Sequence, residues 1–521
     1  MHDDWQPWHN SRYLVPNDPL YSDQWHLSSA DYPDTNIENA WERATGAGVV
    51  IGIVDDSLQH SHPDLSPNYI SEDSWDFGQD DGDPSPVHSD DNHGTSVGGV
   101  AAAKGNNTTG VVGAAFNAGV AGLRIDFPNQ TQQMFADATE YHSTGESPSI
   151  GVKNHSYGTS IPYSASQTQV DALVNSANAG TIHTFAAGNE RSYHGVYVID
   201  ANGNGYFDPD VDPAYDADAN KKHTQSASES IAVAALASDG KYASYSNWGA
   251  NVVVTAPSSG SGPGITTTDR TDSDGYASGD YTDSFGGTSS SSPLVAGILA
   301  LGKELRPDMD GRMAKHLLAR TSAVVDSEDA EWMTNGAGYS FNPNYGFGLI
   351  DADAFTDLTT QVSHLTEMQA VKSGDVVVEE AFGGETTAAE SLTRTLNFDQ
   401  HGTLEEMMVY LDITHDWRGD VEAYLSSPSG TLSRLMTANP ADSFDIIDWQ
   451  FVSNAFWGED LYGEWTLEIV DTNTSEDDGT WNSFNVTAQL GDLVIVPEPT
   501  TLVSILLLGL LVSWFGRRSR S

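Results

Sequence analysis

The segment Val49-Val50-Ile51-Gly52-Ile53-Val54-Asp55-Asp56 decides the fold class of this 521-residue chain. Its first six residues are apolar or glycine and mostly β-branched, which is typical of a strand buried on both faces of a parallel sheet. Side chains at the carboxyl end of such a strand lie where α/β proteins place their chemistry. The segment therefore predicts an α/β domain with Asp55 at the functional edge of the sheet. Taken alone, Asp55 is equally consistent with a turn aspartate.

Two further segments supply the partners that a reactive serine needs. His93-Gly94-Thr95 precedes a run of small residues, which predicts a closely packed helix with His93 at its start. Ser289 follows a Gly-Gly-Thr turn and precedes Pro293 and an apolar run, so we expect it at the start of a buried helix with the proline in the first turn. A serine becomes a nucleophile beside an imidazole that a carboxylate orients. The three segments together predict an Asp-His-Ser triad, although each histidine or serine alone is consistent with an ordinary surface or capping residue.

These segments resemble the subtilisin-like serine proteases, and within them the kexin and furin branch. Asp55-Asp56, the segment 62–65 and the N-terminal stretch 17–27 match that branch, and the chain order aspartate, histidine, serine is that of subtilisin. The resemblance implies a subtilisin-like parallel sheet with helices on both faces. It also implies that Ser289 is the nucleophile and His93 the general base.

The resemblance assigns further roles around this triad. Asn189, in Phe185-Ala186-Ala187-Gly188-Asn189, matches the asparagine that donates to the oxyanion. The segment Asn154–Gly158 resembles the strand that binds the substrate backbone, which makes substrate-binding residues of Ser156, Tyr157 and Gly158. Asp56 and Asp90 match acids of the pocket for the second residue before the cleaved bond.

The match fails at the primary pocket. Ile161 and Gln225 stand where aspartates are expected, Met134 replaces an outer-pocket glutamate, and Asn247 replaces an acid of the family's second calcium site. Asp216 and Asp218 are acids of the neighbouring insertion that could re-enter the pocket. A neutral or mixed primary pocket is therefore at least as plausible as one that prefers basic residues.

The resemblance also implies bound calcium. The side chains of Asp18, Asp64 and Asn107 and the carbonyls of Thr109 and Val111 match a structural Ca²⁺ site, and hard oxygen donors suit this ion. A second, weaker candidate is the EF-hand-like loop 200–208, in which the candidate ligands are Asp200, Asn202, Asn204 and Asp208. Val211 replaces the bidentate glutamate of such loops, so an acidic solvated insertion is nearly as good a reading.

The chain divides into three parts. Residues 1–360 form the expected catalytic domain. Residues 361–491 contain short alternating strands separated by Gly, Pro, Asn and Asp turns, which predicts an all-β jelly roll or sandwich. Phrases such as Gly463-Glu464-Trp465-Thr466-Leu467 resemble the P domain of kexin-type proteases, whose expected role is to pack on the catalytic domain and stabilise it.

The tail 492–521 combines Val496-Pro497-Glu498-Pro499, a hydrophobic stretch and an arginine-rich end. Its length and flanking charges predict a hydrophobic helix in the inner membrane with a cytoplasmic C-terminus. The motif order resembles the PEP-CTERM sorting signal of Gram-negative bacteria. The expected partners are thus an exosortase-type sorting enzyme and, transiently, the membrane, and the expected location is extracellular or at the cell surface. A plain membrane anchor is the alternative.

Composition narrows the function further. The net charge of −52, from 22 basic and 74 acidic residues, excludes a generic nucleic-acid binder. The chain has no cysteine, so disulfides are excluded and calcium is the available cross-link. The acidic start at Met1 has no signal-peptide pattern, and we expect the leader and pro-region to lie upstream.

The sequence therefore predicts a secreted, calcium-stabilised serine endopeptidase that acts on protein or peptide substrates. One alternative is a catalytically silent surface or matrix protein, displayed through its P domain and tail. Another is a regulatory processing convertase, which needs a preference for basic residues at the primary site.

Overall fold

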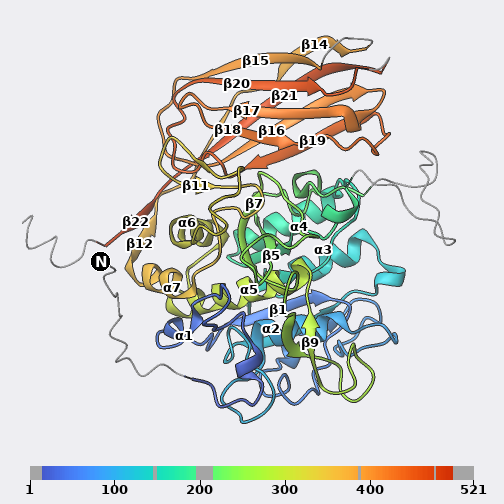
Figure 1. Cartoon of the computed structure of the whole chain (residues 1–521), viewed down its shortest axis with the longest axis vertical. Helices are drawn as coiled ribbons and strands as arrows, with labels where there is room; N and C mark the ends of the chain where they lie inside the picture. Colours follow the sequence, from blue (N-terminus) through green and yellow to red (C-terminus); the bar gives the residue numbers. More distant parts are fainter. Residues whose placement is uncertain (1–14, 145–148, 195–214, 385–388, 475–476, 497–521) are drawn as a thin grey trace, which may run out of the picture.

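A seven-stranded parallel sheet forms the centre of the first domain (Figure 1). This is a computed structural model, and it describes residues 15–144, 149–194, 215–384, 389–474 and 477–496. The strand order is β2-β3-β1-β4-β5-β6-β7. The strands are β1 (Val50–Asp55), β2 (Trp75–Asp76), β3 (Gly119–Arg124), β4 (Ile150–His155), β5 (Ile182–Ala186), β6 (Ser230–Leu236) and β7 (Val252–Pro257).

Helices cover both faces of this sheet, as predicted. On β1, Ile51 and Ile53 join the core formed with α2 and α5, whereas Val54 packs in a cluster with Ala138 of α3 on the opposite face. Alternate residues of one strand thus face two apolar layers, which explains its continuous hydrophobic run. The helices are α1 (Ile37–Ala40), α2 (His93–Ala102), α3 (Gln132–Glu140), α4 (Gln167–Asn178), α5 (Thr288–Leu305), α6 (Gly311–Thr321) and α7 (Ala352–Gln361).

Short elements complete this domain. Two hairpins are formed by β8 (Ile265–Thr268) with β9 (Tyr281–Phe285) and by β10 (Met333–Thr334) with β11 (Ser340–Phe341). The 3-10 turns are η1 (Tyr21–Asp23), η2 (Ser71–Asp73), η3 (Phe127–Asn129), η4 (Arg191–Tyr193) and η5 (Ala219–Lys221).

The second domain is an antiparallel sandwich, which confirms the all-β prediction. One sheet contains β13, β14, β16, β19 and β21, and the other contains β15, β20, β17 and β18. Trp465, Phe451 and Trp481 are fully buried in the core of the sandwich. The elements are β12 (Val362–Leu365), β13 (Gln369–Lys372), β14 (Val376–Gly383), β15 (Glu390–Phe398), β16 (Leu404–His415), η6 (Arg418–Asp420), β17 (Val421–Ser426), β18 (Leu432–Met436), β19 (Ile446–Ser453), β20 (Gly463–Asp471), β21 (Asp478–Leu490) and β22 (Leu493–Ile495).

The two domains are joined by buried polar contacts. The Asn220 amide donates to the carbonyls of Leu435 and Val452, at 2.9 and 3.0 Å, and accepts the Val452 amide at 3.0 Å. Asn335 donates to the carbonyls of Ala455 and Trp457, at 2.9 and 2.8 Å. The sandwich therefore packs on the catalytic domain through specific hydrogen bonds, as expected of a P domain.

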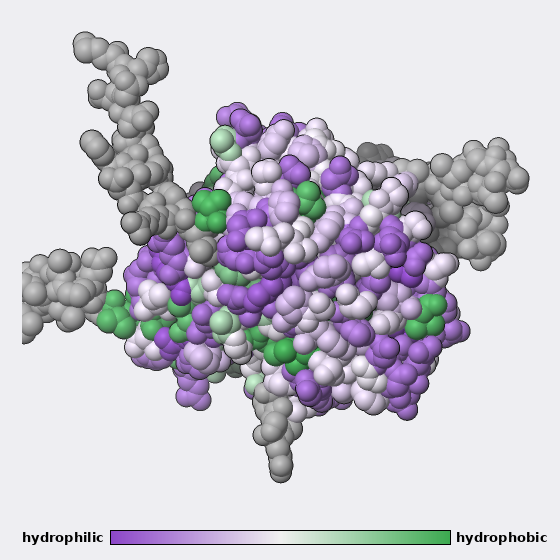
Figure 2. Space-filling model, turned by 90° about the horizontal axis from the view of Figure 1, so that it is seen from below, coloured by the Kyte–Doolittle hydropathy of each residue, from purple (hydrophilic) through white to green (hydrophobic). Residues whose placement is uncertain are grey.

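The surface at the catalytic-domain end is mostly hydrophilic, with small separate apolar patches (Figure 2). That appearance agrees with the acidic composition of the chain. Within the ranges that the structure describes, no helix is long and apolar enough to cross a membrane. The predicted hydrophobic helix and nearly all of the sorting tail lie beyond Val496, outside those ranges.

Candidate active site

Asp55 and His93 meet at the carboxyl edge of the sheet. Asp55 ends β1 and is 2% exposed, and His93 begins α2 with 27% of its side chain exposed. The ring nitrogen Nδ1 lies 2.9 and 3.0 Å from the two oxygens of Asp55. Since a carboxylate only accepts, Nδ1 carries the proton and Nε2 has its lone pair free for a hydroxyl. Gly94 permits this approach, because a Cβ there would lie 2.0 Å from the Ser57 carbonyl oxygen.

Asp56 holds the start of the same helix. One of its oxygens accepts the backbone N–H of His93 and the other that of Gly94, both at 2.9 Å. These amides belong to the first turn of α2, where helical N–H groups have no partner within the helix. A carboxylate at this position also complements the positive end of the helix dipole. Asp56 thus fixes the backbone of the histidine, and at 8% exposure it is nearly closed to solvent.

The two aspartates control the protonation of His93. Burial alone lowers the pKa of His93, but the charge of Asp55, the hydrogen bond to it and the charge of Asp56 raise that pKa to about 9. Burial and the neighbouring charge of Asp55 raise the pKa of Asp56 to about 7. Both aspartates therefore stabilise the imidazolium that forms when a neutral His93 accepts a proton from a hydroxyl.

Ser289 is the second residue of α5, a buried helix that begins at Thr288. The predicted place of Pro293 in the first turn is wrong, because five helical residues precede it. Its missing N–H is the one that would bond the Ser289 carbonyl, four residues earlier. That carbonyl instead accepts the Ser156 hydroxyl at 3.1 Å, while the Ser289 hydroxyl donates to the Ser156 carbonyl at 3.3 Å.

Among the described residues, no hydrogen bond joins Ser289 to His93. The serine hydroxyl rests on the Ser156 carbonyl in this substrate-free state, and the His93 ring packs against Phe285 with centroids 5.5 Å apart. Catalytic hydrogen bonds are often loose without substrate and tighten only in the complex. A rotation of the serine hydroxyl toward Nε2 is the movement that would complete the triad.

Thr288 fixes the orientation of the Asn189 side chain. It follows β5, and its side-chain oxygen accepts the backbone N–H of Thr288 at 2.8 Å and the Thr288 hydroxyl at 3.1 Å. Because a backbone N–H can only donate, the atom facing it must be the oxygen of the Asn189 amide. The NH₂ group of Asn189 is thereby left for a ligand beside Ser289. This role of Thr288 was missed from the sequence.

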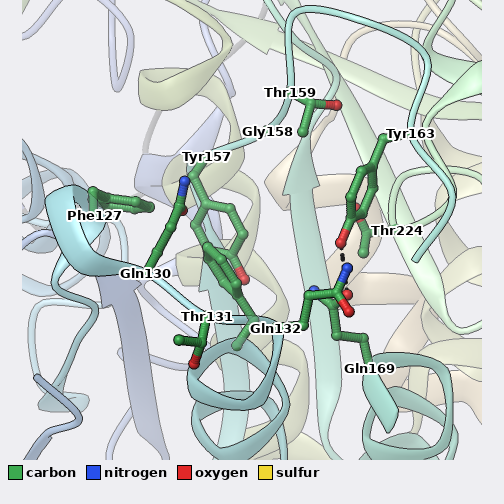
Figure 3. Close-up of a pocket in the computed structure, with 11 residues that line it drawn as sticks. Phe127, Gln130, Thr131, Gln132, Tyr157, Gly158, Thr159, Tyr163, Gln169 and Thr224 are labelled. Carbon is green, nitrogen blue, oxygen red and sulfur yellow. Dashed lines mark hydrogen bonds between the residues drawn. The ribbon is translucent and has the colours of Figure 1, made fainter. Parts of the chain in front are cut away.

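The proposed substrate strand lies next to Ser289. Ser156 is buried, Tyr157 is half-buried and Gly158 is exposed. Gly158 makes no backbone–backbone hydrogen bond to any other residue that the structure describes, as suits an edge that a peptide can join. Beside it opens a cavity of about 300 Å³ (Figure 3). Its aromatic lining residues are Phe127, Phe135, Tyr157 and Tyr163.

The acids expected near the specificity pockets differ in their exposure and in their partners. Asp90 is exposed in the loop before α2. The suggestion that Asp216 and Asp218 re-enter the primary pocket is wrong. Asp216 pairs with Lys221 at 2.8 Å, and Asp218 accepts the backbone N–H of Thr437 in the P domain at 2.8 Å. Both carboxylates are buried in that interface, where their oxygens already have partners.

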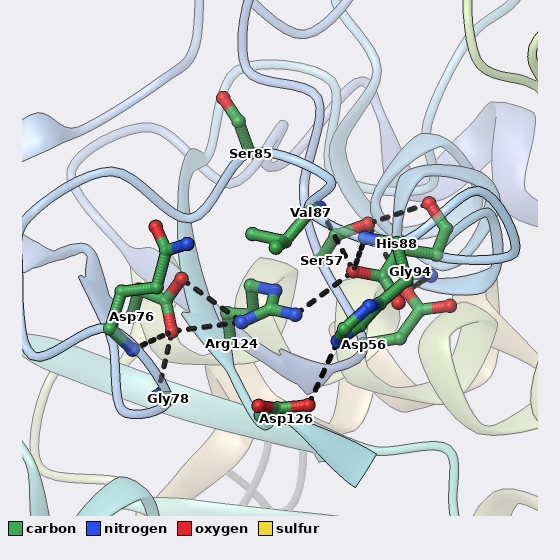
Figure 4. A network of polar contacts seen from close by, with 12 residues as sticks. Asp56, Ser57, Asp76, Gly78, Ser85, Val87, His88, Gly94, Arg124 and Asp126 are labelled. Atoms are coloured by element: carbon green, nitrogen blue, oxygen red, sulfur yellow. Dashed lines mark hydrogen bonds and ion pairs between the residues drawn. The ribbon is translucent and has the colours of Figure 1, made fainter. Parts of the chain in front are cut away.

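A buried arginine that was missed from the sequence supports the loop before α2. Arg124, at the end of β3, contacts both oxygens of Asp76 at 3.1 and 3.0 Å and one of Asp91 at 3.0 Å (Figure 4). Asp91 also accepts the backbone N–H groups of Val87 and His88. Because Asp91 is two residues before His93, this network fixes the approach of the chain to the histidine.

The residues predicted for the first calcium site converge. The carboxylate of Asp18 accepts the backbone N–H groups of Asn106 and Asn107, at 2.7 and 3.1 Å. Asp64 accepts the Asn107 amide at 2.8 Å and the Val111 N–H at 3.0 Å. Burial raises the pKa of Asp64. Two buried carboxylates with amide and carbonyl oxygens are a donor set that fits Ca²⁺.

The second calcium candidate lies outside the described residues, since the structure does not describe 195–214. Asp200, Asn202, Asn204 and Asp208 all fall in that interval. Their assignment stays a prediction from the sequence.

A parallel α/β sheet that presents an aspartate, a histidine and a serine at one edge is the architecture of a serine hydrolase. Residues 46–348 match the model of the Subtilase family, and residues 404–488 match that of the Proprotein convertase P-domain. The chain belongs to the subtilase family, in its kexin- and furin-like branch.

Two relatives support this placement. The chain is 32% identical to mouse (Mus musculus) furin over 486 residues, which cover 91% of this chain. It is 31% identical to the dibasic-processing endoprotease of Schizosaccharomyces pombe over 499 residues, 91% of this chain and 66% of that protein. The chain spans 58% of the length of furin.

A solved structure shows the same overall arrangement. The serine protease of Aeromonas sobria, crystallised with its chaperone, superposes with a TM-score of 0.80 at 26% identity. The match covers 92% of this chain and 96% of the protease. The subtilisin-like fold followed by an all-β domain is therefore that of a known serine protease.

Proposed function

We propose that this chain is a secreted, calcium-stabilised serine endopeptidase. The observation that carries the proposal is the contact of His93 Nδ1 with Asp55, at 2.9 Å, which leaves Nε2 free to accept a proton. Ser289 begins a helix at the same sheet edge, and the Asn189 amide is turned so that its NH₂ group is free. Together they supply a nucleophile, a base and an oxyanion donor.

In the proposed reaction the Ser289 hydroxyl oxygen attacks the peptide carbonyl carbon while its proton passes to His93 Nε2. Asn189 Nδ2 and the Ser289 backbone N–H donate to the oxyanion. The carbon–nitrogen bond then breaks, and His93 returns the proton to the leaving amine. A water molecule, deprotonated by His93, hydrolyses the acyl-enzyme and restores the serine. Asp55 stabilises the imidazolium throughout.

Substrate binding follows from the surroundings of Ser289. A peptide joins the edge at 156–158 as an added strand, beginning at the exposed Gly158, and the aromatic cavity of Figure 3 receives an apolar side chain several residues before the cleaved bond. Asp56 is engaged by two backbone amides, so the exposed Asp90 is the acid left to contact a basic substrate residue.

The nucleophile is tested by Ser289→Ala with two readouts. Wild-type protein should react with a fluorophosphonate probe and cleave an unfolded protein, and Ser289→Ala should lose both with its circular dichroism unchanged. The expected loss in kcat is on the order of 10⁶-fold, as for removal of the nucleophile in subtilisin. Ser290→Ala is the matched control, since it changes the neighbouring serine. A wild-type chain that is neither labelled nor active would favour the alternative of a silent matrix protein.

Calcium would be held by Asp18, Asp64 and Asn107, with the carbonyls of Thr109 and Val111. The ion would cross-link the N-terminal segment to the loop 106–111 and to the segment 62–65, in a chain that has no disulfide. A ligand present at 100 times its Kd adds about 2.7 kcal/mol to the free energy of unfolding.

Chelation tests this calcium site. EDTA should lower the unfolding temperature of the wild type, and Asp64→Asn should lower it without chelator and weaken the response to EDTA. Asp90→Asn, an exposed control, should keep the wild-type response. An Asp64→Asn variant that responds to EDTA as strongly as the wild type would contradict the assignment.

Location and sorting rest on the sequence of the tail. We propose export to the cell surface or medium of a Gram-negative bacterium, with cleavage of the segment after Val496 by an exosortase-type enzyme. Mass spectrometry of the surface-released protein would locate its C-terminus. A mature protein that retains Arg520 would contradict tail removal.

A further inference from the structure

The residue that sets the primary specificity can be located from the strand arrangement. β4 and β5 are adjacent and parallel, with His155 opposite Phe185. The segments that follow them, 156–158 and 186–189, therefore leave the sheet side by side. If the peptide lies along 156–158 with its carbonyl at Ser289 and its oxyanion at Asn189, the side chain next to the cleaved bond must point between these two segments. This reasoning rests on the proposed function.

Gln225 occupies the space between the two segments. Its side-chain nitrogen lies 3.5 Å from the Tyr157 carbonyl oxygen and 3.4 Å from that of Ala186, so the amide bridges both walls. A Cβ added to Gly158 would lie 2.9 Å from the same nitrogen. At 2% exposure, Gln225 is covered by the two walls.

Further hydrogen bonds fix the side chain and the backbone of Gln225. Its side-chain oxygen accepts the Thr224 hydroxyl at 2.7 Å, and its backbone carbonyl accepts the Asn251 amide at 2.8 Å. Its backbone N–H donates to the Lys222 carbonyl at 2.9 Å. With both backbone groups and both ends of the amide engaged, rotation of the side chain out of the site would break several hydrogen bonds.

The charges beneath this site cancel. Lys222 is fully buried, and its ammonium contacts Glu190 at 2.5 Å. A Cβ added to Gly188 would lie 3.0 Å from that ammonium, so the ion pair borders the second wall. The carboxylates of Asp216 and Asp218 already have partners in the P-domain interface. Among the residues that the structure describes, a substrate lysine or arginine would therefore lose its hydration without meeting an unpaired carboxylate at this site.

We propose that Gln225 is the specificity-determining residue of the primary site and that it restricts this protease to short, uncharged side chains before the cleaved bond. The amide blocks long aliphatic and aromatic side chains, and the balanced Lys222–Glu190 pair removes the attraction for basic ones. The substrates are then proteins cleaved after residues such as alanine or serine, not after dibasic pairs.

The test is a peptide library that varies only the residue before the cleaved bond, applied to the full chain. Wild type should cleave after Ala or Ser at least about tenfold faster, in kcat/KM, than after Phe or Arg. Gln225→Gly should gain about tenfold or more for Phe and Leu and retain cleavage after Ala. Gln225→Glu should gain for Arg and Lys. Gln400→Gly, which changes an exposed glutamine of the P domain, should keep the wild-type preference at this position.

The result can be separated from the proposed function by the fluorophosphonate label. Labelled wild type that cleaves after Arg or Phe as fast as after Ala would overturn the inference and leave the protease intact. An unchanged profile in a labelled Gln225→Gly variant would also overturn it. If Gln225→Gly fails to fold, the wild-type profile and Gln225→Glu still decide the question. An unlabelled wild type would remove both proposals.

Discussion

Two histidine–carboxylate pairs in this molecule have opposite electrostatics. His93 contacts Asp55 at the sheet edge, and His316 of α6 contacts Glu405 of the P domain at 2.6 Å. The second nitrogen of His93 has no hydrogen-bond donor among the described residues, whereas that of His316 accepts a hydrogen bond from the Arg320 guanidinium at 2.8 Å. An imidazole nitrogen that accepts a hydrogen bond has no proton of its own, so the Arg320 contact holds His316 neutral.

The directions of the pKa shifts agree with this difference. Burial lowers the pKa of His316. The hydrogen bond to Glu405 and the charge of Glu405 raise this pKa, but the positive charges of Arg320 and Arg312 lower it, and the pKa stays below its ordinary value. In contrast, Asp55 and Asp56 raise the pKa of His93 to about 9. A histidine beside a carboxylate is therefore catalytic or structural according to what faces its other nitrogen.

The largest expected effect comes from breaking the first pair. Asp55→Asn turns an amide NH₂ group toward Nδ1, which favours the tautomer whose proton is on Nε2 and disables the base. We expect kcat to fall about 10⁴-fold. Steady-state kinetics on a cleaved peptide measures this loss. Activity within tenfold of wild type would show that Asp55 does not orient His93.

The matching change in the second pair should affect stability alone. Glu405→Gln removes the charge that pairs with Arg312 and accepts the hydrogen bond of the neutral His316, and breaking such a largely buried ion pair costs roughly 3 kcal/mol in the free energy of unfolding. Unfolding in urea measures the loss, and kcat/KM at 25 °C should be unchanged. Glu464→Gln, an exposed glutamate on β20, is the matched control.

The pH dependence of that loss has a defined sign. Burial raises the pKa of Glu405, but the hydrogen bonds and charges of His316 and Arg312 more than reverse this and lower it below its ordinary value of 4.5. Its contribution is therefore present above pH 4.5 and disappears as the pH falls through the folded pKa. The stability difference between wild type and Glu405→Gln should shrink in acid. A difference that grows in acid would contradict the assignment.

The smallest expected effect comes from removing the charge of Asp56. Its charge helps to keep His93 protonated, so Asp56→Asn should move the acidic limb of the kcat/KM profile toward lower pH by roughly half to one unit. Asparagine retains one acceptor for the amides of His93 and Gly94. Asp90→Asn is the control, since its exposed carboxylate should leave the limb in place. A limb that moves to higher pH would exclude this electrostatic role.

Local patterns were sufficient to predict the elements that carry the triad. The apolar strand before Asp55, the small-residue helix after His93 and the glycine turn before Ser289 each encode their conformation within a few residues. Pro293 was misplaced because the sequence indicates a helix start only to within a turn. Its real position explains why the Ser289 carbonyl is free for Ser156.

Contacts between distant segments could not be predicted in this way. Asp216 and Asp218 accept hydrogen bonds from Asn439 and Thr437, which lie more than 200 residues further along the chain. The orientation of Asn189 depends on Thr288, and the pairing of Glu405 depends on α6. Such contacts are set by how the domains pack, and no local pattern of residues encodes that packing.

The pairing of β22 with β12 determines how the molecule would bear a pull on its C-terminal side. Leu493 lies opposite Leu365 and Ile495 opposite Val362, directly after α7, and the Val496 N–H donates to the Gln361 carbonyl (Figure 1). Tension applied beyond Val496 would pass through this short ladder into β12, which connects α7 to the sandwich. The strands between β12 and β22 lie outside this path, and the sandwich is held on the catalytic domain by its own buried contacts. A pull beyond Val496 would therefore be borne first by the β12–β22 ladder.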